Sequence, residues 1–137
     1  MLSAVIGILV MGSFQDLGQA DARPVVTRPA VECAEHLMND RARRNCLEDL
    51  LESANEQLEA SHASAREEAG EFDLDTGSMF QAASNLDTAQ AAWISYRDAE
   101  CARRGSLMFV SEASREEIII DCQIALTRAR TTELGQY

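Results

Sequence analysis

Basic residues are scarce in this 137-residue chain, which carries 12 Lys and Arg against 23 Asp and Glu and has a formal net charge of −11. Surfaces that bind nucleic acid or anionic membranes neutralise phosphates with Lys and Arg. We therefore expect no nucleic acid among the partners. An acidic surface instead attracts a basic protein partner through long-range electrostatic steering, which salt weakens.

Motifs that carry catalysis are missing as well. The sequence has no glycine-rich phosphate loop and no serine in a nucleophile elbow. Its two histidines, His36 and His62, do not complete a metal-ligand set, and we expect them to be solvated or to cap a helix. A glycosidase needs two carboxylates, but 23 acidic residues make such pairs expected by chance. We expect no enzyme, no cofactor and no metal site.

No apolar run is long enough to cross a bilayer. The uncharged residues 2–11 have the length of a signal-peptide core, and residues 20–22 read Ala-Asp-Ala, an A-x-A cleavage pattern. We therefore expect residues 1–22 to be a signal peptide. The alternative is a buried N-terminal helix, which the flanking small residues and the later Pro24 and Pro29 disfavour. The mature chain would be periplasmic or secreted, with no stable membrane anchor after signal cleavage.

Cysteine usage agrees with export. An even number of cysteines in an exported domain of this size predicts two disulfides and leaves no thiol for catalysis. Zinc is the competing interpretation, but C-x12-C and C-x20-C spacings without a C-x2-C pair do not fit it. If the first two cysteines pair, the chain must turn between them near residues 38–40, because one continuous helix would separate them by ~20 Å. The four residues are Cys33, Cys46, Cys101 and Cys122.

Helical periodicity runs through the rest of the chain, without the alternation typical of strands. The length indicates one domain, at residues 32–135, after an extended, proline-containing linker at residues 23–31. The expected fold class is all-α: a small disulfide-linked antiparallel helical bundle of three main helices, preceded by a signal peptide. The helices are expected at residues 40–69, 79–104 and 115–134, with an acidic loop at residues 71–78.

Glycines mark the expected helix ends, with Gly70 stopping the first helix and Gly105 the second. Apolar residues at helical spacing predict the core, and Trp93 is expected to anchor it. These core residues are Leu47, Leu50, Leu51, Ala54 and Leu58; Phe80, Ala83, Leu86, Trp93 and Ile94; and Ile119, Cys122, Leu126 and Ala129.

The stretch at residues 90–101, Gln-Ala-Ala-Trp-Ile-Ser-Tyr-Arg-Asp-Ala-Glu-Cys, is the most distinctive in the chain. It resembles the N-terminal domain of the lysozyme inhibitor LprI family, in which a Gln, a Trp, an aromatic-Arg-Asp run and a Cys follow one another. Cys33 and Cys46 resemble the family's opening cysteine pair, Leu58 and Gly105 fall at matching places, and residues 122–134 resemble its closing segment. The resemblance implies an exported, disulfide-linked helical domain and, as the namesake's activity, lysozyme inhibition.

Two sets of candidate site residues follow. Trp93, Tyr96, Arg97 and Asp98 are expected to be structural, with the arginine pairing to a carboxylate across the bundle. The acidic run near the end of the first helix is expected to bind a basic partner: Glu67, Glu68, Glu71, Asp73 and Asp75. The apolar residues 107–110 are expected to plug the end of the bundle, although they could form an exposed wedge.

The function expected from these features is an exported protein-binding domain that inhibits c-type lysozyme by occluding the enzyme's cleft with an acidic surface. The alternative is a structural or interaction module of the cell envelope without lysozyme affinity, which docks another protein through residues 107–110.

Overall fold

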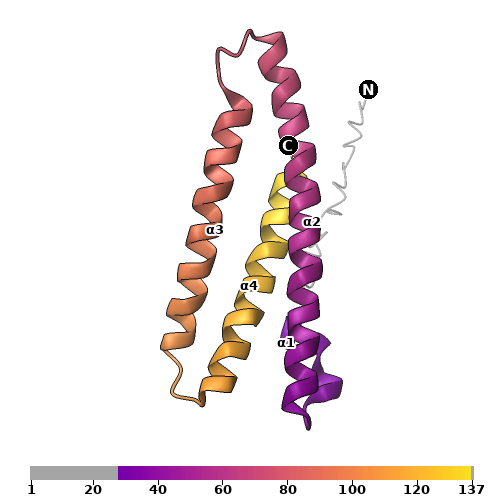
Figure 1. Cartoon of the computed structure of the whole chain (residues 1–137), viewed down its shortest axis with the longest axis vertical. Coiled ribbons are helices and arrows are strands. Elements are labelled where there is room, and N and C mark those ends of the chain that lie inside the picture. Colours follow the sequence, from indigo (N-terminus) through magenta and orange to yellow (C-terminus); the bar gives the residue numbers. More distant parts are fainter. Residues whose placement is uncertain (1–27, 137) are drawn as a thin grey trace, which may run out of the picture.

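The computed structural model describes residues 28–136, which form three long helices and two short turns of helix (Figure 1). Helix α2 (Asp40–Asp75), α3 (Ala82–Ser106) and α4 (Glu112–Leu134) lie side by side and alternate in direction. No strand occurs in the described residues, which confirms the all-α antiparallel bundle. The expected signal peptide and most of the expected linker lie outside the described residues.

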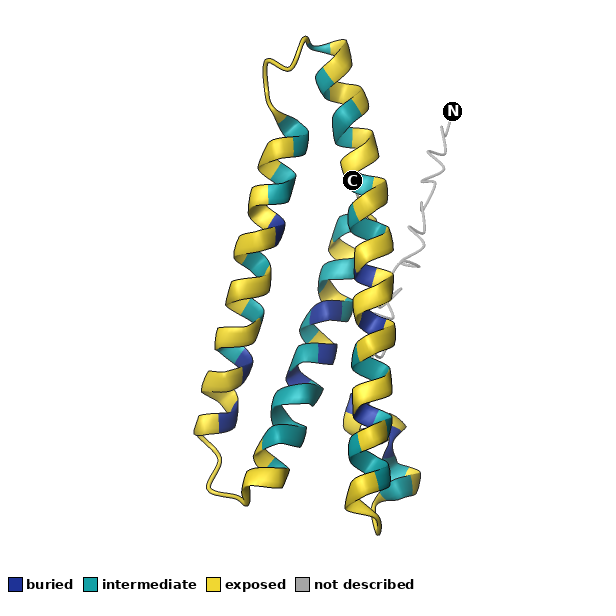
Figure 2. Ribbon diagram, in the orientation of Figure 1, coloured by how far each residue is buried: buried dark blue, intermediate teal, exposed yellow. Residues whose placement is uncertain are grey.

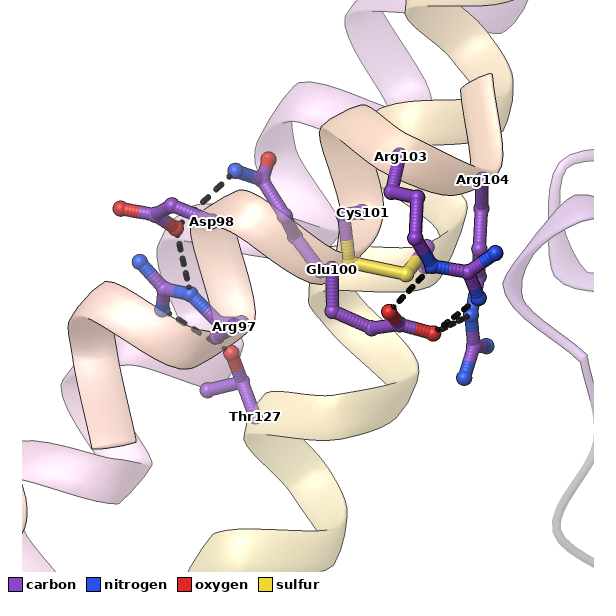
Figure 3. Close-up of a disulfide and its surroundings, with 9 residues drawn as sticks. Arg97, Asp98, Glu100, Cys101, Arg103, Arg104 and Thr127 are labelled. Atoms are coloured by element: carbon purple, nitrogen blue, oxygen red, sulfur yellow. Dashed lines mark hydrogen bonds and ion pairs between the residues drawn. A yellow bond between two sulfur atoms is a disulfide. The ribbon is translucent and has the colours of Figure 1, made fainter. Parts of the chain in front are cut away.

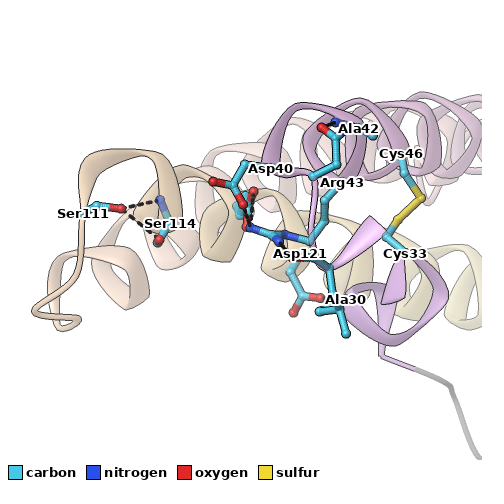
Figure 4. Close-up of polar contacts among 12 residues, drawn as sticks. Ala30, Cys33, Asp40, Ala42, Arg43, Cys46, Ser111, Ser114 and Asp121 are labelled. Carbon is cyan, nitrogen blue, oxygen red and sulfur yellow. Dashed lines mark hydrogen bonds and ion pairs between the residues drawn. A yellow bond between two sulfur atoms is a disulfide. The ribbon is translucent and has the colours of Figure 1, made fainter. Parts of the chain in front are cut away.

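A short helical segment precedes the bundle. Helix α1 (Pro29–Glu32) and the 3₁₀ turn η1 (Ala34–His36) follow Arg28, so the expectation of an extended linker is wrong at residues 29–31. Proline is tolerated in the first turn of a helix, where its missing N–H has no partner to lose. The segment is held against α4, because the N–H of Ala30 donates to Oδ1 of Asp121 at 2.8 Å (Figure 4).

Helix α2 begins where the turn chemistry predicted and ends later. Asn39 caps it, accepting a hydrogen bond from the N–H of Ala42 at 3.0 Å. The helix then continues through Gly70, so the predicted end there and the predicted loop at residues 71–75 are wrong. An interior glycine costs a helix only ~1 kcal/mol relative to alanine. The chain turns instead at Gly77, whose φ of +62° is the left-handed conformation that glycine adopts readily.

The other two helices also differ from prediction at their ends. Helix α3 begins three residues later than predicted, after Gln81 in the left-handed region, and continues through Gly105 to Ser106. Helix α4 begins three residues earlier than predicted, because the Ser111 side chain caps it by accepting from the N–H of Ser114 at 3.2 Å (Figure 4).

Both disulfides connect cysteines that are neighbours in the sequence. Cys33 pairs with Cys46 across the predicted turn, with the Cα atoms 5.9 Å apart, and Cys101 pairs with Cys122 between α3 and α4, at 5.6 Å. Closing loops of these lengths stabilises the fold by about 3 kcal/mol each in the chain-entropy model. This confirms the prediction of two disulfides and settles their pairing.

The core is small and occupies the side of α2 that faces α4 (Figure 2). The predicted face of α2 is confirmed, with Leu47, Ala54 and Leu58 buried and the two other leucines partly buried. On α4 the deepest residues are Ile124 and Thr127, which the prediction missed. Three predicted core positions are wrong, because Phe80, Ile94 and Ala129 are exposed. The other predicted residues of α3, and two of α4, are only partly buried: Ala83, Leu86, Trp93, Ile119 and Leu126.

The predicted apolar plug at residues 107–110 is also wrong. The α3–α4 connection leaves all four side chains exposed, and Phe109 is fully so, at 107% of its reference area. An apolar sequence run alone cannot distinguish a plug from a wedge, because the direction of a loop depends on the helices that it joins.

Gly105 marks a close approach between helices and not a helix end. A Cβ placed there would lie 2.7 Å from Cγ1 of Ile119 on α4. Because β-branched side chains are stiff in a helix, Ile119 has little freedom to move away. Gly105 therefore lets α3 and α4 pack beside the disulfide that joins them.

We predict opposite effects for two glycine-to-alanine substitutions in helices. Gly105→Ala should destabilise the oxidised protein by about 1–2 kcal/mol, because overpacking exceeds the gain in helix propensity. Gly70→Ala is the matched control, since a Cβ there meets no atom within 4 Å, and it should stabilise by about 0.5–1 kcal/mol. Urea unfolding measures both, and equal stabilisation by the two variants would contradict the close approach.

Candidate partner-binding surface

The α2–α3 hairpin projects beyond the third helix. The C-terminal end of α4 lies well short of the α2–α3 connection (Figure 1), in keeping with 36 residues in α2 against 23 in α4. We call residues 67–83 the hairpin tip. Two helices instead of three form it, so each presents more of its surface to solvent than in the body of the bundle.

The Asp73 carboxylate connects the two helices of the hairpin tip, in addition to the backbone hydrogen bonds of the turn itself. Oδ1 of Asp73 accepts a hydrogen bond from the N–H of Ala82 at 2.8 Å, and Oδ2 accepts from that of Ala83 at 3.0 Å. Helix α3 has no side-chain cap at Gln81, so Asp73 supplies from α2 the acceptors that the first turn of α3 needs. Of the five predicted partner-binding residues, Asp73 thus already binds within the chain.

The remaining four predicted residues are exposed and carry uncompensated charge. Residues 67–83 include five acidic residues and no basic one. The nearest cation in sequence, Arg66, is held by Asp87 of α3, with its Nε 3.0 Å from Oδ2. Glu67, Glu71 and Asp75 follow one another at intervals of four residues, so they share one face of α2. Nothing in the hairpin tip offsets the negative potential of this face.

Large apolar side chains lie beside these acids, and the sequence did not lead us to predict that they are exposed. Phe72, Leu74, Met79 and Phe80 are exposed, Leu74 at 82% of its reference area. The rings of Phe72 and Phe80 lie 5.7 Å apart and bridge the two sides of the turn. The sequence does contain a signal for an apolar surface here, because four large apolar residues within nine positions are more than a solvated loop needs. Exposed apolar groups ringed by polar residues are typical of binding surfaces.

A groove runs from the hairpin tip to the end of α4. It has a volume of about 470 Å³, and Phe72, Leu86 and Leu134 line it together with the aliphatic part of Glu68. Glu68 therefore lies on a different side of α2 from the acidic face. The groove gives the hairpin tip an apolar recess next to its charges.

A second groove, of about 530 Å³, lies between α2 and α3 below the hairpin tip. Its lining includes His62, whose Nε2 lies 3.5 Å from Oδ1 of Asp87, while that buried nitrogen has no hydrogen-bond partner among the described residues. The sequence analysis expects His62 to be solvated or to cap a helix. It instead faces α3 with its Nε2 buried, and 22% of its side chain is accessible. The partly buried His36 lies 3.3 Å from a carboxylate oxygen of Glu35.

Arg97 ties the three helices together below this groove (Figure 3). Its Nη1 donates to Asn55 on α2 at 3.0 Å and to the buried Oγ1 of Thr127 on α4 at 3.1 Å. Its guanidinium also lies over the Trp93 ring, 5.4 Å from the centroid. The expected carboxylate across the bundle is absent from these contacts, because the ion pair is made with the adjacent Asp98, at 2.9 Å.

The other residues of the motif differ in burial. Tyr96 is exposed, whereas only 13% of the Arg97 side chain is accessible. All 12 basic residues of the chain are arginines, and a guanidinium offers several donors in a fixed plane that an ammonium cannot reproduce. This geometry explains how one side chain of α3 can bind both neighbouring helices.

Within residues 28–136, no group of His, Cys, Asp and Glu has an arrangement that could hold a metal ion. No helix in the same range is long and apolar enough to cross a bilayer.

The sequence model of the family described as lysozyme inhibitor LprI matches residues 33–134. The chain belongs to this family. The match to LprI begins at the first disulfide cysteine and ends with the last residue of α4, so it includes both disulfides, the Trp93–Arg97 contacts and the whole hairpin tip. LprI is a family of inhibitor domains and not of enzymes. Comparison with curated proteins and with solved structures finds no match.

We predict that the Asp73 cap is a stability determinant of the hairpin tip. Asp73→Ala should lower the free energy of unfolding by about 1 kcal/mol, because two N–H groups of α3 lose their acceptors. Asp75→Ala should leave it unchanged or slightly higher, since an acid in the last turn of a helix opposes the macrodipole. Urea unfolding and amide exchange at Ala82 and Ala83 provide the readouts. If both variants unfold alike, the cap is not what holds the turn.

We also predict that replacing Arg97 by lysine lowers the stability of the fold. Arg97→Lys should cost about 1–3 kcal/mol, because a single ammonium cannot reach Asn55, Asp98 and Thr127 together. Arg66→Lys is the control at an exposed ion pair and should change stability by less than about 0.5 kcal/mol. Thermal unfolding of the oxidised proteins tests this prediction. An Arg97→Lys variant as stable as the wild type would show that these contacts contribute little to stability.

Proposed function

We propose that this LprI-family chain is an exported inhibitor of c-type lysozyme and that its hairpin tip occludes the enzyme's cleft. The observation that carries the proposal is the combination at the hairpin tip of exposed apolar side chains with four exposed acidic residues and no basic residue. The family description supplies lysozyme as the target class.

The two kinds of side chain have separate roles in this proposal. The face formed by Glu67, Glu71 and Asp75 attracts the basic enzyme at long range and raises the association rate. Phe72, Leu74 and Phe80 bury apolar area once the hairpin tip has docked, and they set the dissociation rate. Asp73 acts indirectly, by holding the turn in shape.

Export is part of the proposal. Disulfides persist in oxidising compartments and are rare in the bacterial or eukaryotic cytosol, and this chain has two. In addition, residues 1–22 have the pattern of a signal peptide. We therefore place the mature chain in the periplasm or outside the cell, without a stable membrane anchor.

An envelope interaction module without lysozyme affinity is the second candidate. The observation that favours it is the exposure of residues 107–110 at the other end of the bundle. A partner of this module would bind through apolar contacts, so its affinity would depend little on salt.

Charge reversal tests the hairpin tip directly. The triple variant Glu67→Lys, Glu71→Lys and Asp75→Lys should slow association of oxidised residues 23–137 with c-type lysozyme by about tenfold or more at low salt. Stopped-flow binding and inhibition of cell-wall lysis are the measurements. The expected difference from wild type shrinks as salt rises, because screening weakens the steering.

The matched control reverses three exposed acids in the middle of the same helix, in the variant Asp49→Lys, Glu52→Lys and Glu56→Lys. Both triple variants have the same net charge, so a general effect of charge would slow them equally. Equal slowing, or unchanged association in the hairpin-tip variant, would reject the hairpin tip as the binding surface. No inhibition by the wild-type chain at physiological salt would reject lysozyme as the target.

A further inference from the structure

The end of the bundle opposite the hairpin tip has a different charge balance. The start of α2 and the α3–α4 connection both lie at this end (Figure 1), and we call residues 34–44 and 100–118 the basal pole. The basal pole contains six arginines and six acidic residues, so it is formally neutral in a chain of net charge −11. Two copies of the chain repel each other over most of their surface, and they repel each other least when their basal poles meet.

The basal pole also exposes large apolar side chains from both of its segments. Met38 is accessible to 99% and Phe109 is fully exposed, while Leu107 and Val110 are exposed beside it. Single exposed apolar residues are common on protein surfaces, but a cluster on one end of a small domain marks an interaction site. Phe109 is the largest of these side chains and the most exposed.

A hollow of about 550 Å³ lies next to these projecting side chains. Apolar atoms form most of its lining, from Leu37, Leu47, Met108 and Ile118 among others. Charged side chains of both signs also line it: Arg28, Arg43, Arg104, Glu117 and Asp121. The volume is in the range that accommodates small organic ligands, so a phenyl group fits. The same end of the molecule therefore carries both a protruding ring and an apolar recess.

Most charges of the basal pole are already paired within the chain. Arg43 binds Glu117, with Nε 3.0 Å from Oε2, and Arg103 and Arg104 both bind Glu100, which lowers the pKa of that carboxyl to about 2 (Figure 3). Among the described residues, Arg41, Arg115 and Glu112 make no ion pair. The basal pole thus carries charges of both signs that form no ion pair among the described residues.

We propose that the basal pole is a homodimer interface, in which two copies meet around a two-fold axis and Phe109 of each copy enters the hollow of the other. A two-fold contact needs a self-complementary patch, and this one offers a ring for the recess and charges of both signs at its rim. A strongly basic or acidic partner would gain little from a neutral pole, which favours a second copy. The dimer presents its two hairpin tips at opposite ends.

Sedimentation velocity of oxidised residues 23–137 from low to high micromolar concentration, without lysozyme, tests the proposal. The wild type should convert from monomer to dimer across this range. Phe109→Ser should raise the dissociation constant by at least about tenfold, because a buried phenyl group is lost. Leu37→Arg, which replaces an apolar lining residue of the hollow by a larger cation beside Arg43 and Arg104, should do the same from the other side of the contact.

Phe80→Ser is the matched control, since it removes an exposed ring from the hairpin tip and should leave dimerisation unchanged. Circular dichroism checks that each variant is folded. A wild type that stays monomeric at the highest concentration overturns the proposal, as does a dimer that Phe80→Ser weakens and Phe109→Ser does not. Because lysozyme is absent from the experiment, its result is independent of the proposed inhibition.

Discussion

Two covalent cross-links hold a helical bundle that has little apolar core of its own. Cys33 and Cys101 are completely buried, and the cysteines form a large share of the buried side chains, together with Leu47, Leu58 and Ile124. One disulfide pins the N-terminal turns to α2, and the other pins α3 to α4. A small domain gains too little free energy of folding from apolar burial alone. The two disulfides, together with Arg97 bridging the three helices, therefore determine which surfaces need not contribute to the core.

The two ends of the molecule differ because of this arrangement. Both disulfides lie on the side of the basal pole. The hairpin tip has no cross-link and is held by hydrogen bonds, among them those of the Asp73 carboxylate. The hairpin tip can therefore carry unpaired acids and exposed rings without contributing to the core. The basal pole pairs most of its charges internally and leaves apolar groups outside. We propose that one end binds a basic protein and the other a second copy of the chain.

Local signals in the sequence predicted the elements well, and long-range contacts explain what they missed. The caps at Asn39 and Ser111 and the spacing of the α2 leucines act within a few residues, so helices and their core faces could be placed, and an even cysteine number predicted the disulfides. Gly70 and Gly105 were misread as helix ends, because only the partner helix shows whether a glycine serves a turn or a close approach. Only Ile119 on α4 explains Gly105.

The sequence predicted the acidic charge of the candidate site but not the arrangement of its side chains. The acidic run was visible in the sequence, but Asp73 is a cap, and Phe72 and Phe80 became surface residues only because α4 ends before the hairpin does. Amide hydrogen exchange of the oxidised chain with and without c-type lysozyme tests most directly whether the hairpin tip binds the enzyme. We expect new protection in residues 67–83 and along the adjoining end of α4. Protection confined to residues 34–44 and 100–118, or no protection at all, would contradict it.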